Sequence, residues 1–259
     1  TPVVLCLNAG SATLKFAIHD LARPATCLLR GEADREGSAI KLVLDGRHLA
    51  SARELADAPE LLVHALARDR PTWRIEAVAH RIVHGGPHHA GPAVLDDDLL
   101  IELAQFTRFA PLHQPAGIAM ARKAREVLGG AVHVACFDTA FHATLSDLAR
   151  EFALPAELRE RGYRRFGFHG LSFDHVARRL AAERPELRRV VVAHLGGGSS
   201  LCALLERRSV ATTMGLTALD GVPMTTRSGA LDPGAVIALV RELGVDVAEE
   251  LLYRRSGLA

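Results

Sequence analysis

The chain has 259 residues, of which 49% are hydrophobic and 24% charged, and its formal net charge is +1. This length is enough for two domains, and the composition is that of a globular protein rather than a disordered one. The near-zero charge argues against bulk attraction to nucleic acid or to an anionic membrane. No run approaches the roughly 20 apolar residues of a membrane helix.

The cysteines are widely spaced and lie mostly in apolar runs, with no CxxC pair and no secretory signal. This pattern predicts reduced thiols in a cytoplasmic protein. The four residues are Cys6, Cys27, Cys136 and Cys202.

The first half of the chain begins with two apolar runs, Val3 to Leu7 and Leu14 to Ile18, separated by a small polar turn that contains glycine. That pattern is typical of a β-hairpin. Runs near 26–34 and 38–44 predict further strands, and apolar spacing from Leu55 to Leu66 predicts a helix. Later apolar runs at 75–79 and 131–137 alternate with predicted helices, one of which has Pro115 near its start and Gly129 past its end. We therefore predict a mixed α/β fold.

A second cycle starts at Val190 to Ala193, passes through a glycine-rich turn at 194–200 and returns as a strand through 201–205. Aligning Leu14 with Leu201 places Gly10 on Gly197, which suggests a duplicated domain. The boundary is expected between about residues 140 and 165. We divide the chain into domains 1–148 and 149–259.

Several helix starts are marked by their capping residues. The run Asp96–Asp98 predicts a helix start rather than a metal site, because acidic residues favour the positive helix N-terminus. Asp232 and Pro233 form an N-cap and N1 pair, and Ser172 is an expected N-cap. Asp246 with Glu249 resembles a capping box.

Two turns contain the residue types that hold phosphate. In Asn8–Lys15, a tight hairpin would point backbone N–H groups and hydroxyls outward, with Lys15 at its base. The glycines at 196–198 would let a ligand approach the backbone closely. Each turn alone is equally an ordinary strand connection, but the presence of both favours a nucleotide. Neither a Walker A loop nor a G-x-G-x-x-G motif after a strand is present.

Three other segments carry candidate polar groups, each with a structural alternative. His80, His84 and His88 lie four apart, but the glycines and proline between them break any helix that could gather them around zinc, so a buried strand is the better interpretation. Asp138 ends an apolar strand, where open α/β sheets bind ligands, or it is an N-cap. His169 is a site residue or a core histidine.

The arginines present a similar choice. Arg227, in a polar loop before a helix, could hold a carboxylate or phosphate with two hydrogen bonds, or it could be a surface residue. The cluster formed by Arg159, Arg161, Arg164 and Arg165 is expected to be a solvated basic face rather than a nucleic-acid patch.

Eight segments in register resemble the acetate kinase family over essentially the whole chain. They are NAGSATLK, HRIVHGG, APLHQPA, FDTAFH, FGFHG, HLGGGSS, MGLTALDG and TRSGALDPG. The resemblance implies the two-lobed, ribonuclease H-like α/β fold shared by acetate and sugar kinases, heat-shock chaperone ATPases and actin. It implies reversible, direct in-line transfer of the γ-phosphoryl group of ATP to a short-chain carboxylate, acetate or propionate. Mg²⁺ (or Mn²⁺), ATP/ADP and a homodimer are also implied.

The resemblance assigns roles by position. The implied catalytic residues are Arg81, His113, Asp138, His169 and Arg227. The implied nucleotide-binding residues are Asn8, Ser11, Lys15, His194, Gly196, Gly197 and Gly198, with Asn8 also near the metal. The implied pocket for the substrate alkyl group is formed by Val83, Leu112, Phe168 and Ala218.

The chain departs from the family pattern at a few positions. Family members usually carry Asn where this chain has Gly197, a feature closer to butyrate kinases. Ala218 replaces a common proline, which should enlarge the alkyl pocket, so propionate is expected to be accepted comparably with acetate. The family continues for well over a hundred residues beyond Ala259. The alternatives are therefore a truncated, non-catalytic fragment that binds nucleotide or a partner, and a butyrate kinase-type enzyme.

Overall fold

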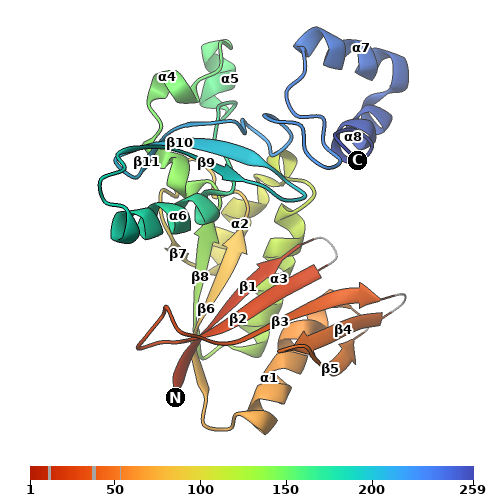
Figure 1. Cartoon of the computed structure of the whole chain (residues 1–259). Helices are drawn as coiled ribbons and strands as arrows, with labels where there is room; N and C mark the ends of the chain where they lie inside the picture. The colour runs from red at the N-terminus through yellow and green to blue at the C-terminus, as the bar shows by residue number, and fades with distance from the viewer. Residues whose placement is uncertain (11–12, 37–38, 53) are drawn as a thin grey trace. The chain divides into compact units, whose positions relative to one another are not determined.

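The structure is a computed structural model that describes residues 1–10, 13–36, 39–52 and 54–259. These residues form two compact units, Thr1–Phe137 and Asp138–Ala259 (Figure 1). The segment just after Phe137 belongs to the second unit because its backbone and side chains bond there: Gly170 N donates to Asp138 O, and His142 contacts Ser209. The division at 148/149 inferred from the sequence stays a prediction about domains.

The first unit is built on an eight-stranded sheet in the order β5-β4-β3-β2-β1-β6-β8-β7. β1 runs parallel to β6, and β6 runs parallel to β8, whereas the other pairs are antiparallel. The strands are β1 (Pro2–Ala9), β2 (Thr13–Asp20), β3 (Cys27–Glu36), β4 (Ala39–Leu44), β5 (Arg47–Ala52), β6 (Arg74–Ile82), β7 (Ala93–Val94) and β8 (Val132–Phe137).

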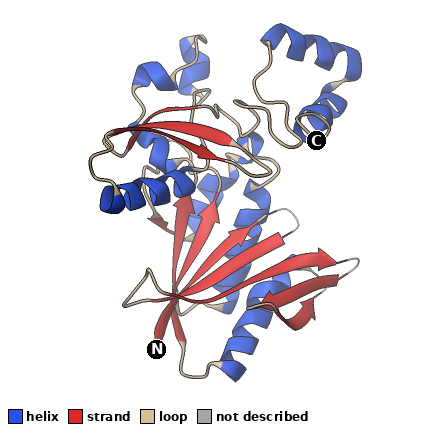
Figure 2. Ribbon diagram, in the orientation of Figure 1, coloured by secondary structure: helices blue, strands red, loops and turns tan. Residues whose placement is uncertain are grey.

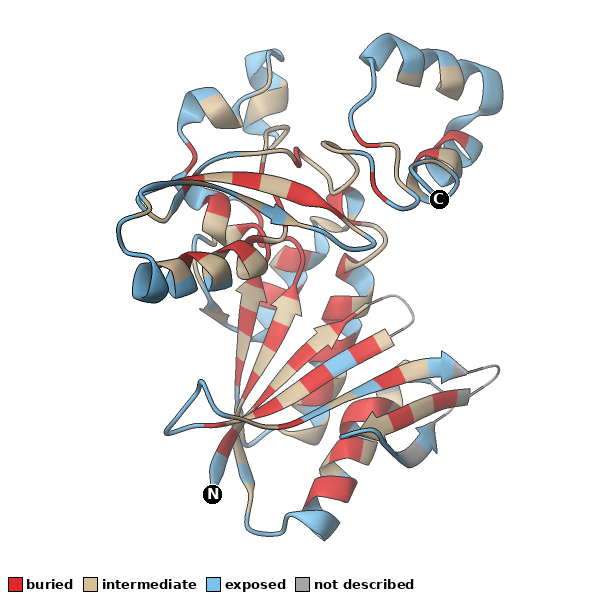
Figure 3. Cartoon of the chain, in the orientation of Figure 1, coloured by how far each residue is buried: buried red, intermediate tan, exposed pale blue. Residues whose placement is uncertain are grey.

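Helices cover one face of this sheet (Figure 2). Alternate residues of β1 and β2 are buried, from Val3 to Ala9 and from Leu14 to Ile18, and they pack with Leu62 of α1 and Met120 of α3 (Figure 3). Period-two burial is what places every second side chain on the helix side. The helices are η1 (Leu55–Asp57), α1 (Ala58–Asp69), α2 (Asp97–Ala104), η2 (Thr107–Phe109) and α3 (Gln114–Val127).

The second unit contains a three-stranded antiparallel sheet in the order β11-β10-β9. One side of it packs against α6, where Phe173 and Ala177 meet Cys202 and Leu204. The elements are η3 (Ala140–Thr144), α4 (Asp147–Arg150), α5 (Ala156–Glu160), α6 (Gly170–Glu183), β9 (Arg189–His194), β10 (Ser200–Leu205), β11 (Arg208–Thr212), α7 (Pro233–Leu243) and α8 (Val245–Arg254).

The mixed α/β fold and both strand-turn-strand openings are confirmed, since β1 pairs antiparallel with β2 and β9 with β10. Two helix starts are also confirmed: Asp96 accepts from Leu99 N at 2.8 Å, and Asp232 accepts from Ala235 N at 3.0 Å. β5 was not predicted.

Two predicted caps are wrong. α6 begins after His169, so Ser172 lies inside the helix and its hydroxyl contacts His194 instead of capping. Gly244 is the N-cap of α8, with no side-chain cap, so Asp246 and Glu249 form no capping box. All four cysteines are free thiols. Within the described ranges, no helix is both long and apolar enough to cross a membrane.

Candidate functional site

Three polar side chains form a row across neighbouring strands of the first unit. Asn8 on β1 lies directly opposite Lys15 on β2, and Arg81 on β6 donates from Nη1 to Asn8 Oδ1 at 2.9 Å. All three alternate with buried residues of their strands, so they lie on the face opposite the helices. They also lie near the carboxyl ends of parallel strands β1 and β6, where α/β sheets place ligands. The row offers two cations and an amide to an anion.

The turn after β6 is fixed by Gln114, a residue that the sequence analysis missed. Its buried side chain accepts from His84 N at 3.0 Å and donates to His84 O at 2.9 Å and to Leu103 O at 3.1 Å. Because Val83 adjoins His84 and His113 adjoins Gln114, these bonds bring the two predicted site segments together. A glutamine at the first position of a helix gives no sequence signal for such a role.

His80, one of the three histidines spaced four apart, pairs with a histidine of the neighbouring strand. His80 Nε2 lies 2.9 Å from His133 Nδ1, and the two rings stack. Because His133 Nε2 donates to Leu128 O, its Nδ1 accepts from His80. Burial lowers the pKa of His80 to about 3 and also lowers the pKa of His133, so the pair is neutral at pH 7. Among the described residues, no group of three or more His, Cys, Asp or Glu side chains could hold a metal.

In the second unit, Asp138 is brought next to the segment that carries His169. Asp138 is buried, and its carbonyl accepts from Gly170 N at 2.8 Å. A Cβ on Gly170 would lie 2.2 Å from that carbonyl oxygen, so the close approach requires glycine. The N-cap of η3 is Thr139, so the capping alternative for Asp138 is wrong. His169 itself adopts a left-handed conformation, φ 60°, which is costly for a residue other than glycine.

His169 and His194 form a stacked pair, with ring centroids 4.1 Å apart. Each Nδ1 contacts a serine from the other histidine's segment: His169 lies 2.8 Å from Ser200 Oγ, and His194 lies 2.9 Å from Ser172 Oγ. These crossed contacts join the start of α6 to the glycine turn between β9 and β10. The His169 ring lies beside Gly198, since a Cβ there would lie 3.4 Å from His169 Nε2.

Arg227 lies beside the same glycine. A Cβ placed on Gly198 would lie 3.6 Å from Arg227 Nη1. The guanidinium also donates to Ala218 O at 3.1 Å. Burial lowers the pKa of Arg227, and nearby Tyr253 opposes that effect, but an arginine stays charged at neutral pH. A partly desolvated cation beside an imidazole and a glycine turn is suited to an anion.

Phe168, predicted for the alkyl pocket, is held by a buried chain of hydrogen bonds. His142 Nε2 donates to Phe168 O at 3.0 Å, and its Nδ1 accepts from Ser209 Oγ at 2.8 Å. The Cys202 thiol in turn donates to Ser209 Oγ at 3.3 Å. Burial lowers the pKa of His142 to about 4. His142 was not predicted as a functional residue, because its partners are 26 and 67 residues away.

The predicted site residues thus fall into local groups. Asn8, Lys15 and Arg81 lie in one row, and Val83, Leu112 and His113 lie around Gln114. In the second unit, Asp138, Phe168, His169, His194, the 196–198 glycines, Ala218 and Arg227 are linked by successive contacts. Ser11 lies outside the described residues.

Comparison with known proteins identifies the family. Residues 3–259 match the Acetokinase family. The chain is 42% identical to an acetate kinase of Rhodopseudomonas palustris (strain TIE-1), over 99% of this chain and 68% of that protein. The chain belongs to the acetokinase family.

Solved structures agree with this membership. A propionate kinase from Francisella tularensis superposes with a TM-score of 0.91 at 33% identity, covering 99% of this chain and 69% of that one. An acetate kinase from Entamoeba histolytica superposes with a TM-score of 0.84 at 30% identity, covering 98% of this chain and 66% of that one. The fold is therefore that of the acetokinase family, whose members are phosphotransferases with a carboxyl acceptor.

The glycine turn fits the nucleotide use of the acetokinase family. A Cβ on Gly197 would meet nothing within 4 Å, and Ser199 Oγ bonds both Gly196 N and Gly196 O, so the base of the turn is fixed while its middle borders open space. A phosphate could approach the backbone there without steric interference.

Proposed function

We propose that this chain is an ATP-dependent kinase of short-chain carboxylates that forms an acyl phosphate from acetate or propionate. The supporting observation is the meeting of the Arg227 guanidinium and the His169 imidazole at Gly198 of the glycine turn. Phosphoryl transfer needs positive charge and hydrogen-bond donors around the transferred group, rather than a protein nucleophile.

The proposed roles follow from the residue types. A carboxylate substrate has a pKa of roughly 4 to 5 and is already ionised at pH 7, so no strong general base is needed. Arg227 and Arg81 would neutralise the equatorial oxygens and the carboxylate, and His169 and His113 would donate hydrogen bonds. Asp138 is better suited to orient a cation or a water than to accept a proton. In-line geometry supplies the rest of the acceleration.

The metal is a proposal as well. Mg²⁺ takes most of its ligands from phosphates and water, so one protein oxygen is enough. Asn8 Oδ1 accepts from Arg81 at 2.9 Å and retains a second lone pair, which is compatible with a contact to Mg²⁺ or to its water. Bound Mg²⁺ would add charge compensation for ATP.

The acyl chain would be held by Val83, Leu112, Phe168 and Ala218. Because alanine lacks the proline ring common in the family, propionate should be used comparably with acetate. A series from acetate to butyrate measured by kcat/KM tests this. A preference for acetate above about tenfold contradicts the alkyl-pocket assignment, and a preference for butyrate favours the butyrate kinase type.

Arg227→Ala tests the transfer site. We expect kcat to fall by about 10³-fold, as for other charge-stabilising arginines. The matched control is Arg241→Ala on α7, an exposed arginine that should leave kcat unchanged. A loss below about tenfold for Arg227→Ala removes that residue from the site.

Hydroxylamine trapping decides between catalysis and binding alone. Incubation with ATP, Mg²⁺ and acetate should give acetohydroxamate from the acyl phosphate. A folded chain that binds ATP but gives no hydroxamate is a non-catalytic nucleotide-binding protein instead.

Location and assembly complete the proposal. Four free thiols suit the reducing cytoplasm. A homodimer through the second unit would cover Ile237 of α7, which is 51% exposed. Sedimentation velocity at several concentrations tests the dimer.

A further inference from the structure

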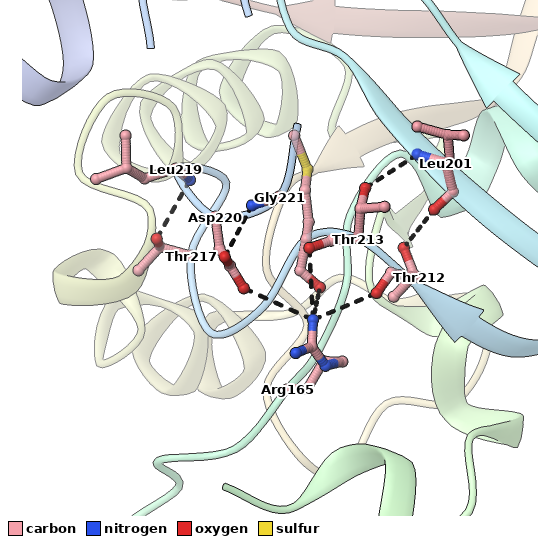
Figure 4. A network of polar contacts seen from close by, with 9 residues as sticks. Arg165, Leu201, Thr212, Thr213, Thr217, Leu219, Asp220 and Gly221 are labelled. Atoms are coloured by element: carbon pink, nitrogen blue, oxygen red, sulfur yellow. Dashed lines mark hydrogen bonds and ion pairs between the residues drawn. The ribbon is translucent and has the colours of Figure 1, made fainter. Parts of the chain in front are cut away.

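Arg165 is the centre of a polar network in the second unit that the proposed chemistry does not use directly (Figure 4). Its Nη1 donates to three successive backbone carbonyls at the end of β11, at 3.3, 3.4 and 3.0 Å. The same nitrogen lies 3.6 Å from Asp220 Oδ2. The carbonyls belong to Thr212, Thr213 and Met214. The expectation of a solvated arginine face is therefore wrong for Arg165, whose side chain is only 24% exposed.

These contacts help to hold the loop from Met214 to Gly221, whose Gly215 O also accepts from Phe166 N and Gly167 N. Arg165 fixes the first residue of the loop, and Asp220 fixes the last, since its Oδ1 accepts from Gly221 N at 2.8 Å. Within the loop, Leu219 N donates to Thr217 Oγ1 at 3.2 Å. One guanidinium nitrogen thus holds both ends of an eight-residue segment, counted from 214 to 221.

The middle of this loop bears on Arg227. Ala218 lies between the two anchored ends, and its carbonyl accepts from Arg227 Nη1 at 3.1 Å. The other end of the loop is linked to the segment around Arg227 as well, because Ala230 N donates to Gly221 O at 2.8 Å. A shift of the loop would therefore move the acceptor that orients the Arg227 guanidinium.

We propose that Arg165, together with Asp220, is a positioning residue that acts through the 214–221 loop to orient Arg227. The expected kinetic effects rest on the proposed kinase function, whereas the contacts between Arg165, the loop and Arg227 do not depend on that function. A guanidinium that must face a transferred group tolerates little displacement, and a misplacement of about 1 Å can cost about 10²-fold in rate.

The contacts also specify which substitution should rescue. The hydrogen bonds and the ion pair of the Arg165 side chain converge on a single nitrogen, Nη1, rather than on the two-nitrogen fork that usually makes arginine irreplaceable. The ammonium of a lysine, with three donors, can serve the same carbonyls. Arg165→Lys should retain most of the function, and Arg165→Met, of similar length but uncharged, should lose it.

The kinetic test is a double-mutant cycle between Arg165→Met and Arg227→Ala, with acyl phosphate formation as the readout. We expect Arg165→Met alone to lower kcat roughly 10- to 100-fold with KM for ATP within about threefold of wild type, and Arg165→Lys to stay within about fivefold. In the Arg227→Ala background, Arg165→Met should change kcat less than about threefold, because the residue it orients is gone. Equal losses in both backgrounds would overturn the proposal.

A second readout needs no activity. The Nε–Hε resonance of Arg227 can be assigned in a ¹⁵N spectrum by its disappearance in Arg227→Lys. We expect it to shift or broaden in Arg165→Met and to stay in place in Arg165→Lys. Arg178→Met is the control, since Arg178 is 79% exposed on α6. An unchanged Arg227 resonance in a folded Arg165→Met chain overturns the proposal.

The two readouts separate the two failures. If the wild-type chain forms no acyl phosphate, the proposed function fails, and the resonance alone decides whether Arg165 positions Arg227. If the wild-type chain is active but the cycle is additive, only the positioning role fails.

Discussion

The buried histidine His142 gives a prediction about the pH dependence of stability. It is 1% exposed and joins η3 to Phe168 O and to Ser209 on β11, and its neutral form is needed for the bond that Nδ1 accepts from the Ser209 hydroxyl. Protonation would turn Nδ1 from an acceptor into a donor facing the Ser209 hydroxyl. We consider His142→Gln, because an amide offers a donor and an acceptor but does not titrate.

The magnitude follows from the pKa of His142. An imidazole in the unfolded chain titrates near 6.5, whereas burial lowers the pKa of folded His142 to about 4. Between these values the unfolded state binds a proton that the folded state does not, so stability that is fully present above pH 6.5 is lost as pH falls towards 4. The difference corresponds to about 3 kcal/mol, since each tenfold change in proton affinity is about 1.4 kcal/mol.

The measurement is hydrogen exchange across a urea series at several pH values between about 4 and 7.5, read on peptides of β10 and β11. The free energy of unfolding of the wild type should fall by about 3 kcal/mol more than that of His142→Gln over this range. The control is His175→Gln, an exposed histidine of α6, which should follow the wild type. Parallel curves for wild type and His142→Gln would refute the reasoning.

Three further substitutions have expected outcomes. Gly170→Ala places a Cβ 2.2 Å from Asp138 O, so urea unfolding should show a loss of about 2 kcal/mol or more, and a neutral result contradicts the close approach. Gln114→Leu leaves both backbone groups of His84 without their amide partner. The same assay should therefore show a free energy of unfolding lower by about 2 to 4 kcal/mol. Gly197→Asn meets open space and restores the amide usual in the family, so stability should hold and KM for ATP should fall; a higher KM contradicts this.

The elements that could be predicted from sequence are those encoded by local patterns. Two apolar runs around a polar, glycine-containing turn predicted β1 and β2, and Asp96 and Asp232 marked helix starts because a cap bonds residues only three positions away. Ser172 failed as a cap for a tertiary reason. Its hydroxyl contacts His194, 22 residues later, and the helix begins earlier, at a left-handed His169 that no propensity favours.

The supporting residues of the site escaped prediction because their roles depend on distant partners. Gln114 acts on a turn 30 residues away, and Arg165 acts on carbonyls 47 to 49 residues away. Backbone carbonyls leave no trace in a sequence, so an arginine that serves them resembles any surface arginine. The motif residues could be predicted as site residues because they occur in recognisable segments, whereas Gln114 and Arg165 could not.

The two glycine turns differ in how they are closed. The first turn is closed by a main-chain bond, Gly10 N to Thr13 O at 2.7 Å, and the cationic side chains of Lys15 and Arg81 lie on the strands beside it. The second is closed at its base by the Ser199 hydroxyl. Since a side chain closes it, backbone groups at its middle remain able to face a ligand. We therefore expect the second turn to hold nucleotide phosphate through its backbone, and the first unit to act through side-chain charge.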